Sequence, residues 1–311
     1  MIWARRAAVV LSAASLLFGC ASHAAESDGP RSSAPARGSQ TDAPPAALAT
    51  WVWKAAIVTE PSERDELLAF SRVHGVSSLF VADVPIFQTD AGFAALADLV
   101  RRGHAQGLAV SWVEGDPSWA LTEYHAEALG VLENLRRVNA RLRETALPEI
   151  ASVQYDIEPY LVPEWRSRSE EIEAQYVALL DELRPAARTA GLTLWVTAPF
   201  WFDHQSFRGT AIDRAVLPRV DGVVVMAYRK SAASVADKAQ GILRDARAAG
   251  RPVIVALELG CAVTPESTMC GESASGIDRA LSDVHARLAG FSSLAGLAVH
   301  QYSSWREAAS R

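Results

Sequence analysis

Two acidic side chains lie close together at the end of an apolar run that spans residues 151–158. In an extended strand, side chains two positions apart share a face, so Gln154, Asp156 and Glu158 point to the same side. Two carboxylates on one face repel each other, which raises the pKa of one and lowers that of the other. A general acid that works at neutral pH needs such a raised pKa. The alternative is a hydrogen-bonded pair that braces the interior, but the position of Glu158 at the end of the run favours catalysis.

Polar and aromatic residues also follow other apolar runs. Glu258 and Tyr228 each end such a run, and we add both to Asp156 and Glu158 as predicted catalytic residues. Tryptophans gather at the ends of several runs, which predicts a flat and partly apolar ligand such as a sugar ring, although any one of them could be a buried core residue. The predicted substrate-binding residues are Trp53, Asp116, Trp119, Tyr160, Trp201, Asp203, Arg229, His300, Tyr302 and Trp305.

The apolar runs themselves predict eight β-strands, because each is short, rich in Val, Leu, Ile and Trp, and followed by a longer stretch of helical period. Repeated strand–helix units over residues 49–311 predict one α/β domain, a closed (β/α)₈ TIM barrel. An open, doubly wound sheet is the alternative, but no Gly-rich phosphate turn follows any strand. Barrels of this kind carry their catalytic side chains at the carboxyl ends of the strands. The predicted strands are 49–53, 76–82, 108–113, 151–158, 192–197, 222–228, 252–259 and 297–302, and the predicted helices are 61–73, 90–106, 120–144, 169–190, 209–217, 232–249 and 275–289.

The amino terminus has the pattern of an export signal. Two arginines precede a short apolar run, and residues 17–20 (Leu-Phe-Gly-Cys) resemble the lipobox of bacterial lipoproteins. This resemblance implies cleavage after residue 19 and a lipid on Cys20, which would anchor the protein to a membrane. It also implies where the protein is located: on the outer membrane facing the periplasm in a diderm bacterium, and on the cell surface in any other bacterium. A plain signal peptide cleaved near Ala24 is the alternative. Residues 20–48 are rich in Ser, Ala, Pro and Gly, which predicts a disordered tether.

The remaining composition narrows the function classes. Thirty Lys and Arg against 36 Asp and Glu give a net charge of −6, which argues against a nucleic-acid partner. Export permits Cys261 and Cys270 to form a disulfide bond, because the oxidising compartment outside the cytoplasm lets such bonds persist. Two cysteines are too few for a structural zinc site, and no other metal or cofactor motif is present, so we predict neither a metal nor a cofactor.

Two strand ends resemble those of the family 18 glycoside hydrolases, the chitinases and their relatives. In that family the fourth strand ends in Asp-x-x-Asp-x-Asp-x-Glu and the sixth in Met-x-Tyr, which correspond here to 151–158 and 226–228. The resemblance implies that Glu158 protonates the glycosidic oxygen, that Asp156 orients the acetamido group of the substrate, and that Tyr228 supports the intermediate. The chain departs from the pattern at Ala151 and Gln154, and Arg229 stands where an Asp commonly follows the tyrosine.

A second resemblance concerns retaining barrel glycosidases. Many of these carry an acid/base Glu, often in Asn-Glu-Pro, at the end of strand four and a nucleophilic Glu at the end of strand seven, which correspond here to Glu158 and Glu258. The chain is also similar to an uncharacterised group of bacterial barrel lipoproteins with comparable Asp-x-Glu-Pro-Tyr and Met-Ala-Tyr-Arg segments. We therefore predict a glycosidase acting on a cell-envelope or extracellular polysaccharide or glycoconjugate. A non-catalytic glycan-binding protein on a degenerate barrel is the alternative from another class.

Overall fold

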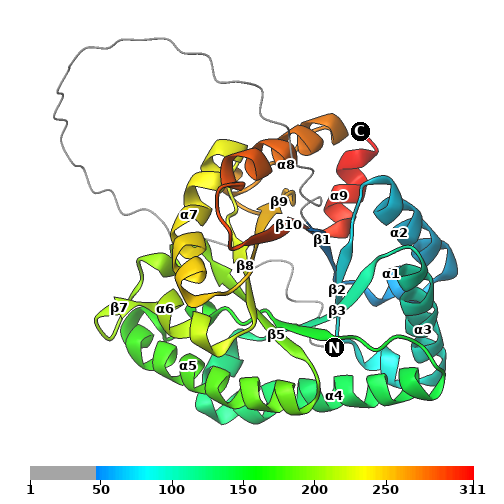
Figure 1. Cartoon of the computed structure of the whole chain (residues 1–311), viewed down its shortest axis with the longest axis horizontal. Helices are drawn as coiled ribbons and strands as arrows, with labels where there is room; N and C mark the ends of the chain where they lie inside the picture. The colour runs from blue at the N-terminus through cyan, green and yellow to red at the C-terminus, as the bar shows by residue number, and fades with distance from the viewer. Residues whose placement is uncertain (1–46) are drawn as a thin grey trace. The chain divides into compact units, whose positions relative to one another are not determined.

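A computed structural model describes residues 47–311, which form a closed barrel of eight parallel strands (Figure 1). The strand order around the barrel is β1-β10-β9-β8-β5-β4-β3-β2, so neighbours in sequence are neighbours in space. This confirms the predicted (β/α)₈ fold. The barrel strands are β1 (Ala47–Val52), β2 (Ser78–Ala82), β3 (Ala109–Glu114), β4 (Ser152–Tyr155), β5 (Thr193–Pro199), β8 (Gly222–Met226), β9 (Val253–Glu258) and β10 (Leu294–His300).

A ring of helices surrounds these strands (Figure 1). Several helices end at a glycine with a positive φ, such as Gly250 at 65°, where a residue without a Cβ adopts the left-handed conformation at little cost. Seven helices lie where the helical periodicity predicts them, and two short ones, α1 and α9, do not correspond to a predicted helix. The helices are α1 (Ala55–Thr59), α2 (Pro61–Val73), α3 (Asp90–Ala105), α4 (His125–Glu144), α5 (Trp165–Thr189), α6 (Ile212–Val216), α7 (Ala232–Ala249), α8 (Ala274–Leu288) and α9 (Tyr302–Ala309).

Short 3₁₀-helices form much of the connections that follow the carboxyl ends of the strands. A small antiparallel hairpin, β6 (Ser206–Phe207) with β7 (Thr210–Ala211), adds to the connection after β5. The 3₁₀-helices are η2 (Pro85–Gln88), η3 (Pro117–Ala120), η4 (Thr122–Tyr124), η5 (Pro159–Leu161), η6 (Phe200–Asp203), η7 (Leu217–Arg219) and η8 (Pro265–Ser267). The hairpin and all of these helices except η7, which leads from α6 into β8, shape the end of the barrel at which catalytic residues are expected.

Side-chain parity along β4 follows the predicted alternation. Tyr155 faces the helices, since its hydroxyl donates a 2.8 Å hydrogen bond to the carbonyl of Ala128 in α4. Gln154 faces the barrel interior, where its amide donates to the hydroxyl of Thr197 in β5 at 2.8 Å. Both residues are fully buried. We expected this strand to extend to residue 158, but β4 ends at Tyr155; its pairing continues only to Asp156, and Glu158 lies in the turn that follows.

The carboxyl terminus differs from the predicted course. We expected the last strand to extend to residue 302, but it ends at His300 and the chain turns into α9. Tyr302 and Trp305, three residues apart, therefore share one helix face and pack edge-on against Phe70 of α2, each with ring centroids 5.3 Å away. Both rings are almost fully buried in this helix–helix contact. Their burial supports a role in packing instead of the substrate binding that we expected of them.

Some expectations lie outside the described residues. The signal peptide, the lipidated Cys20 and almost all of the tether fall within residues 1–46, and only the last two tether residues are described, as the start of β1. Within residues 47–311, no helix combines the length and the apolar character that a membrane span requires.

Candidate functional site

Asp156 and Glu158 lie directly after β4, at the carboxyl end of the barrel. The amide of Asp156 donates a 2.9 Å hydrogen bond to the carbonyl of Glu114, which continues the strand pairing by one residue. Gly115 makes this approach possible, because a Cβ at that position would lie 1.9 Å from the carbonyl oxygen of Asp156. The chain therefore passes Asp156 at a distance that only glycine permits, and this fixes where the acidic pair lies at the carboxyl end of the barrel.

The carboxyl group of Glu158 has the electrostatics expected of a general acid. Burial, together with the negative charge of Asp156, raises its pKa from 4.5 to about 7. The hydrogen bond from Tyr160 and the nearby His300 act in the opposite direction without cancelling the effect. The residue as a whole is not fully buried, so part of Glu158 is open to solvent. A carboxyl group that is half protonated near neutral pH and still accessible can donate a proton in the physiological range.

Tyr160 lies over Glu158 because the chain turns sharply between them. Pro159 begins η5, and the amide of Leu161 donates a 3.0 Å hydrogen bond back to the carbonyl of Glu158. This turn brings the hydroxyl of Tyr160 to Oε2 of Glu158, to which it donates a hydrogen bond. The ring of Tyr160 meets that of Trp201 from η6 in an edge-on contact with centroids 5.2 Å apart. The predicted residues Tyr160 and Trp201 therefore lie beside the acid.

Tyr228 reaches the same group of carboxylates from the end of β8. Burial and the negative charges of Glu258, Asp156 and Glu158 raise the pKa of its hydroxyl well above the ordinary value. Burial and these charges keep the hydroxyl protonated, so it is able to donate a hydrogen bond. The next residue, Arg229, donates a 2.8 Å hydrogen bond to the carbonyl of Tyr228 and stacks over the ring of Phe200 at 4.1 Å.

Glu258 at the end of β9 is held on both carboxylate oxygens. Its Oε2 lies 2.8 Å from Nδ1 of His300, and its Oε1 accepts a 2.5 Å hydrogen bond from the amide of Gly260. The indole of Trp53 donates to Nε2 of His300 at 3.1 Å, so in the neutral form of His300 this nitrogen is the acceptor and Nδ1 carries the proton that Glu258 accepts. Burial lowers the pKa of His300, but the charge of Glu258 outweighs this effect and the net pKa is raised.

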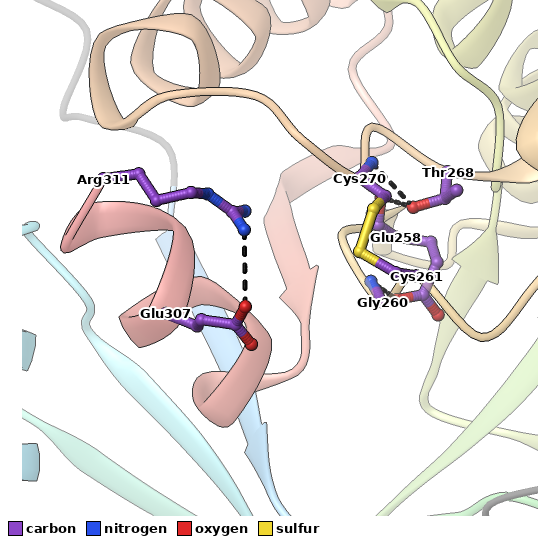
Figure 2. The surroundings of a disulfide bond; sticks show 7 residues. All are labelled: Glu258, Gly260, Cys261, Thr268, Cys270, Glu307 and Arg311. Atoms are coloured by element: carbon purple, nitrogen blue, oxygen red, sulfur yellow. Dashed lines mark hydrogen bonds and ion pairs between the residues drawn. A yellow bond between two sulfur atoms is a disulfide. The ribbon is translucent and has the colours of Figure 1, made fainter.

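The loop that follows β9 encloses Glu258. The carbonyl of Glu258 accepts hydrogen bonds from the amide of Met269 at 2.9 Å and from the hydroxyl of Thr268 at 3.2 Å. A disulfide bond joins Cys261 to Cys270, with Cα atoms 5.1 Å apart, and closes the loop next to these contacts. Figure 2 shows the disulfide bond directly beside the Glu258 side chain. The predicted pairing of the two cysteines is thus present in the structure, and it borders the site.

The structure therefore brings the four predicted catalytic residues to one end of the barrel. They are joined there by part of the predicted substrate-binding set. The side chains that lie together are Asp156, Glu158, Tyr160, Trp201, Tyr228, Glu258, His300 and Trp53, with Arg229 adjoining Tyr228.

Three further predicted binding residues make contacts of other kinds. Asp116 caps η3 by accepting hydrogen bonds from the amide and hydroxyl of Ser118. Trp119 packs near the outward-facing Tyr155, and its indole donates to Glu127 of α4 at 3.3 Å. The carboxylate of Asp203 lies against Gly241 of α7 and contacts the neighbouring His204. These contacts do not join the three residues to Glu158.

The predicted tryptophan platform is accordingly much smaller than expected. Trp112 is fully buried and its ring lies 5.9 Å from that of Phe87, while Trp51 is buried against Phe80 with centroids 4.9 Å apart. Trp53 and Trp201 are the site tryptophans that remain partly exposed. The rest serve packing, because a large ring next to a strand end fills the space between sheet and helices as readily as it lines a cleft.

Two glycines have roles that the sequence analysis did not assign. Gly115 permits the close approach of Asp156, and Gly260 places its amide on Glu258, where a Cβ would lie 2.9 Å from Oε1. Each follows a predicted strand by one or two residues, and an isolated glycine at such a place is a known signal of close backbone approach. Among residues 47–311, no group of three or more His, Cys, Asp or Glu side chains is arranged to hold a metal ion.

Solved structures of low sequence identity share the barrel. A GH18 chitinase from Pseudoalteromonas aurantia is 13% identical, with a TM-score of 0.55 over 85% of this chain and 96% of that chain. The spore cortex-lytic enzyme SleL of Bacillus cereus is 13% identical, with a TM-score of 0.51 over 84% and 73% of the two chains. A monomeric beta-xylosidase from Caulobacter crescentus CB15 is 15% identical, with a TM-score of 0.52 over 82% and 59%. No family model and no curated protein matches the sequence.

These similarities establish the fold and not the chemistry, because one barrel architecture supports many unrelated reactions. The function depends on the side chains at the carboxyl end of the barrel.

Proposed function

We propose that the protein is a glycoside hydrolase in which Glu158 is the general acid. The observation that carries the proposal is the proximity of Asp156 and Glu158 at the carboxyl end of the barrel, with the pKa of Glu158 raised to about 7 by burial and by Asp156. A glycosidase acid must be protonated at working pH and must ionise as the glycosidic bond breaks. The GH18 chitinase and the cortex-lytic enzyme named above act on glycans by their names, which is consistent with a polysaccharide or glycoconjugate substrate.

Substrate-assisted chemistry is the mechanism that the arrangement favours. In this mechanism a carbonyl oxygen of the substrate attacks the anomeric carbon while Glu158 gives its proton to the leaving oxygen. Asp156, two residues from the acid at the same end of the barrel, is placed to orient the attacking group. Tyr228, whose hydroxyl stays protonated among the carboxylates, is a hydrogen-bond donor for the same group.

The alternative uses Glu258 as a direct nucleophile, and its hydrogen bonding argues against this role. Each oxygen of Glu258 already accepts a hydrogen bond, Oε1 from Gly260 and Oε2 from His300, which holds the carboxylate in one orientation and makes it a weaker nucleophile. The side chain of Glu258 is only 5% exposed. We assign Glu258 to holding His300, and through it Trp53, at the edge of the site.

The test is a hydrolysis screen on chitin oligosaccharides and peptidoglycan, measured as newly formed reducing ends. Glu158→Gln and Asp156→Asn should each lower turnover by at least about 100-fold, because general acid catalysis and substrate positioning contribute on that scale. Glu144→Gln, an exposed carboxylate at the far end of α4, is the matched control and should retain full activity.

The variants also separate the competing functions. An inactive Glu258→Gln beside an Asp156→Asn of near wild-type activity would show that the second carboxylate is Glu258 and that the substrate-assisted mechanism is wrong. A protein that binds these glycans, with no hydrolysis by wild type, would show that the barrel is a binding module.

We further propose that the protein is exported and anchored by a lipid on Cys20. The chain enters β1 at Ala47, at the end of the barrel opposite to the one that carries Glu158. A tether that leads into β1 therefore joins the barrel on the side away from the site. Cell fractionation tests this: wild type should partition with membranes, and Cys20→Ser should be released or remain unprocessed. A processed, membrane-bound Cys20→Ser protein would contradict the proposal.

A further inference from the structure

The contact between Tyr160 and Glu158 distinguishes the two oxygens of the acid. The hydroxyl of Tyr160 donates a hydrogen bond to Oε2 of Glu158 and thereby marks one of the two oxygens. In a neutral carboxylic acid, one oxygen carries the proton and the other is the better acceptor. A donor held on Oε2 makes that oxygen the acceptor and leaves the proton on Oε1.

The position of Tyr160 is fixed from two directions. The η5 turn that begins at Pro159 folds the chain back, with the amide of Val162 donating to the carbonyl of Pro159 at 3.1 Å. On the other side, the ring of Tyr160 is held edge-on against Trp201 at 5.2 Å. A phenol fixed by a backbone turn and by a neighbouring ring loses little freedom on forming its hydrogen bond, so the bond is preorganised.

We propose that Tyr160 is a positioning residue that selects which oxygen of Glu158 carries the acid proton and then stabilises the carboxylate that remains. The proposal deepens the glycosidase function proposed above and rests on it for its catalytic part. In the proton-transfer step, the O–H bond at Oε1 of Glu158 breaks and a new O–H bond forms on the leaving glycosidic oxygen. The electron pair left on Glu158 becomes carboxylate charge, part of which Oε2 shares with the hydroxyl of Tyr160.

Other charged groups also face Glu158 and must be separated from the effect of Tyr160. Asp156 raises the pKa of Glu158, and His300, which is paired with Glu258, lowers it. Tyr228 faces the same carboxylates with its hydroxyl protonated. A replacement at position 160 leaves all four of these groups in place. A change in the titration of Glu158 after that replacement therefore reports the hydrogen bond from Tyr160.

The experiment measures the pKa of Glu158 without any substrate. Infrared difference spectra recorded across a pH series detect the carbonyl stretch of a protonated carboxyl group, and the band lost in Glu158→Gln identifies Glu158. Tyr160→Phe keeps the ring contact with Trp201 and removes only the hydroxyl. Tyr155→Phe is the matched control. It also removes one buried hydroxyl hydrogen bond, but this bond lies on the side of β4 that faces the helices, where Tyr155 donates to Ala128 of α4.

We expect Tyr160→Phe to raise the pKa of Glu158 by about one pH unit, the scale of a hydrogen bond to a charged group. Tyr155→Phe should leave that pKa unchanged. A fluorotyrosine at position 160, a stronger donor of the same shape, should move the pKa downward, which a loss of structure would not do. If the enzyme hydrolyses a glycan, kcat of Tyr160→Phe should fall about tenfold. The alkaline limb of its pH profile should then move upward with the pKa.

Two results would overturn the assignment: an unchanged or lowered pKa of Glu158 in Tyr160→Phe, or an equal rise in Tyr155→Phe. Because the titration needs no substrate, it separates this proposal from the glycosidase function. One outcome is that the protein hydrolyses no glycan while Glu158 titrates as expected in the variants. That result would refute the proposed glycosidase activity and support the role of Tyr160 in setting the protonation of Glu158.

Discussion

Replacing Glu158 by glutamine should make the folded protein more stable at pH 8 while removing its acid. Burial and Asp156 raise the pKa of Glu158 from 4.5 to about 7 in the folded state, so folding opposes its ionisation. Below pH 4.5 the group is protonated in the folded and unfolded chains alike, and it has no effect on the free energy of unfolding. Between pH 4.5 and 7 only the unfolded chain releases the proton, and stability falls by about 1.4 kcal/mol per pH unit. Above pH 7 the full cost, at most about 3.5 kcal/mol, remains.

Glutamine mimics the neutral acid and can still accept the hydrogen bond from Tyr160. The stability gained by Glu158→Gln should therefore be small at pH 5 and grow to about 2–3 kcal/mol at pH 8. Urea unfolding followed by tryptophan fluorescence at the two pH values measures this difference. Glu144→Gln, with its exposed carboxylate, should show no comparable change with pH. If Glu158→Gln were equally stable relative to wild type at both pH values, Glu158 would not be a buried acid with a raised pKa.

Three further changes test other parts of the barrel. Burial raises the pKa of Asp213 to about 7. In urea unfolding, Asp213→Asn should therefore stabilise the protein more at pH 8 than at pH 5. An equal stability change at the two pH values would contradict this. Replacing Cys261 and Cys270 together by serine should lower the free energy of unfolding by about 2–3 kcal/mol. A loss below about 0.5 kcal/mol is what an ordinary surface substitution causes, and it would show that the loop is held without the disulfide bond. Gly115→Ala should be strongly destabilising, because its Cβ would meet the carbonyl oxygen of Asp156 at 1.9 Å, and a normal melting temperature would refute this close approach.

The strand and helix pattern of the barrel could be predicted from the sequence because periodicity is a local property. The runs of β-branched residues and the glycines that end helices are set by neighbours within a few positions. The proximity of Asp156 and Glu158 at the carboxyl end of a strand could also be predicted, and the charge of Asp156 does act on Glu158. The alternation itself could not place Glu158, because β4 ends at Tyr155 and Glu158 lies in the turn that follows.

The aromatic residues were harder to place because they lie beyond the strands. Trp119 belongs to η3 and Trp305 to α9, and in such segments the alternation with a period of two no longer decides the direction of a side chain. Trp305 instead follows helical spacing, three residues after Tyr302, and both rings pack on α2. The sequence shows that these rings are near a strand end, but it does not show which surface they cover.

The role of Glu258 illustrates a different limit, because it depends on which groups occupy its oxygens. From the sequence, a Glu at the end of strand seven is equally suited to attack a sugar or to hold a neighbour. The decisive contacts come from His300, on the adjacent strand β10, and from the amide of Gly260 in a loop closed by a disulfide bond. Since both oxygens are engaged, the carboxylate is held in one orientation and its charge is directed to His300. The choice between the two roles of Glu258 therefore depends on hydrogen bonds from two other segments, which its position in the strand does not reveal.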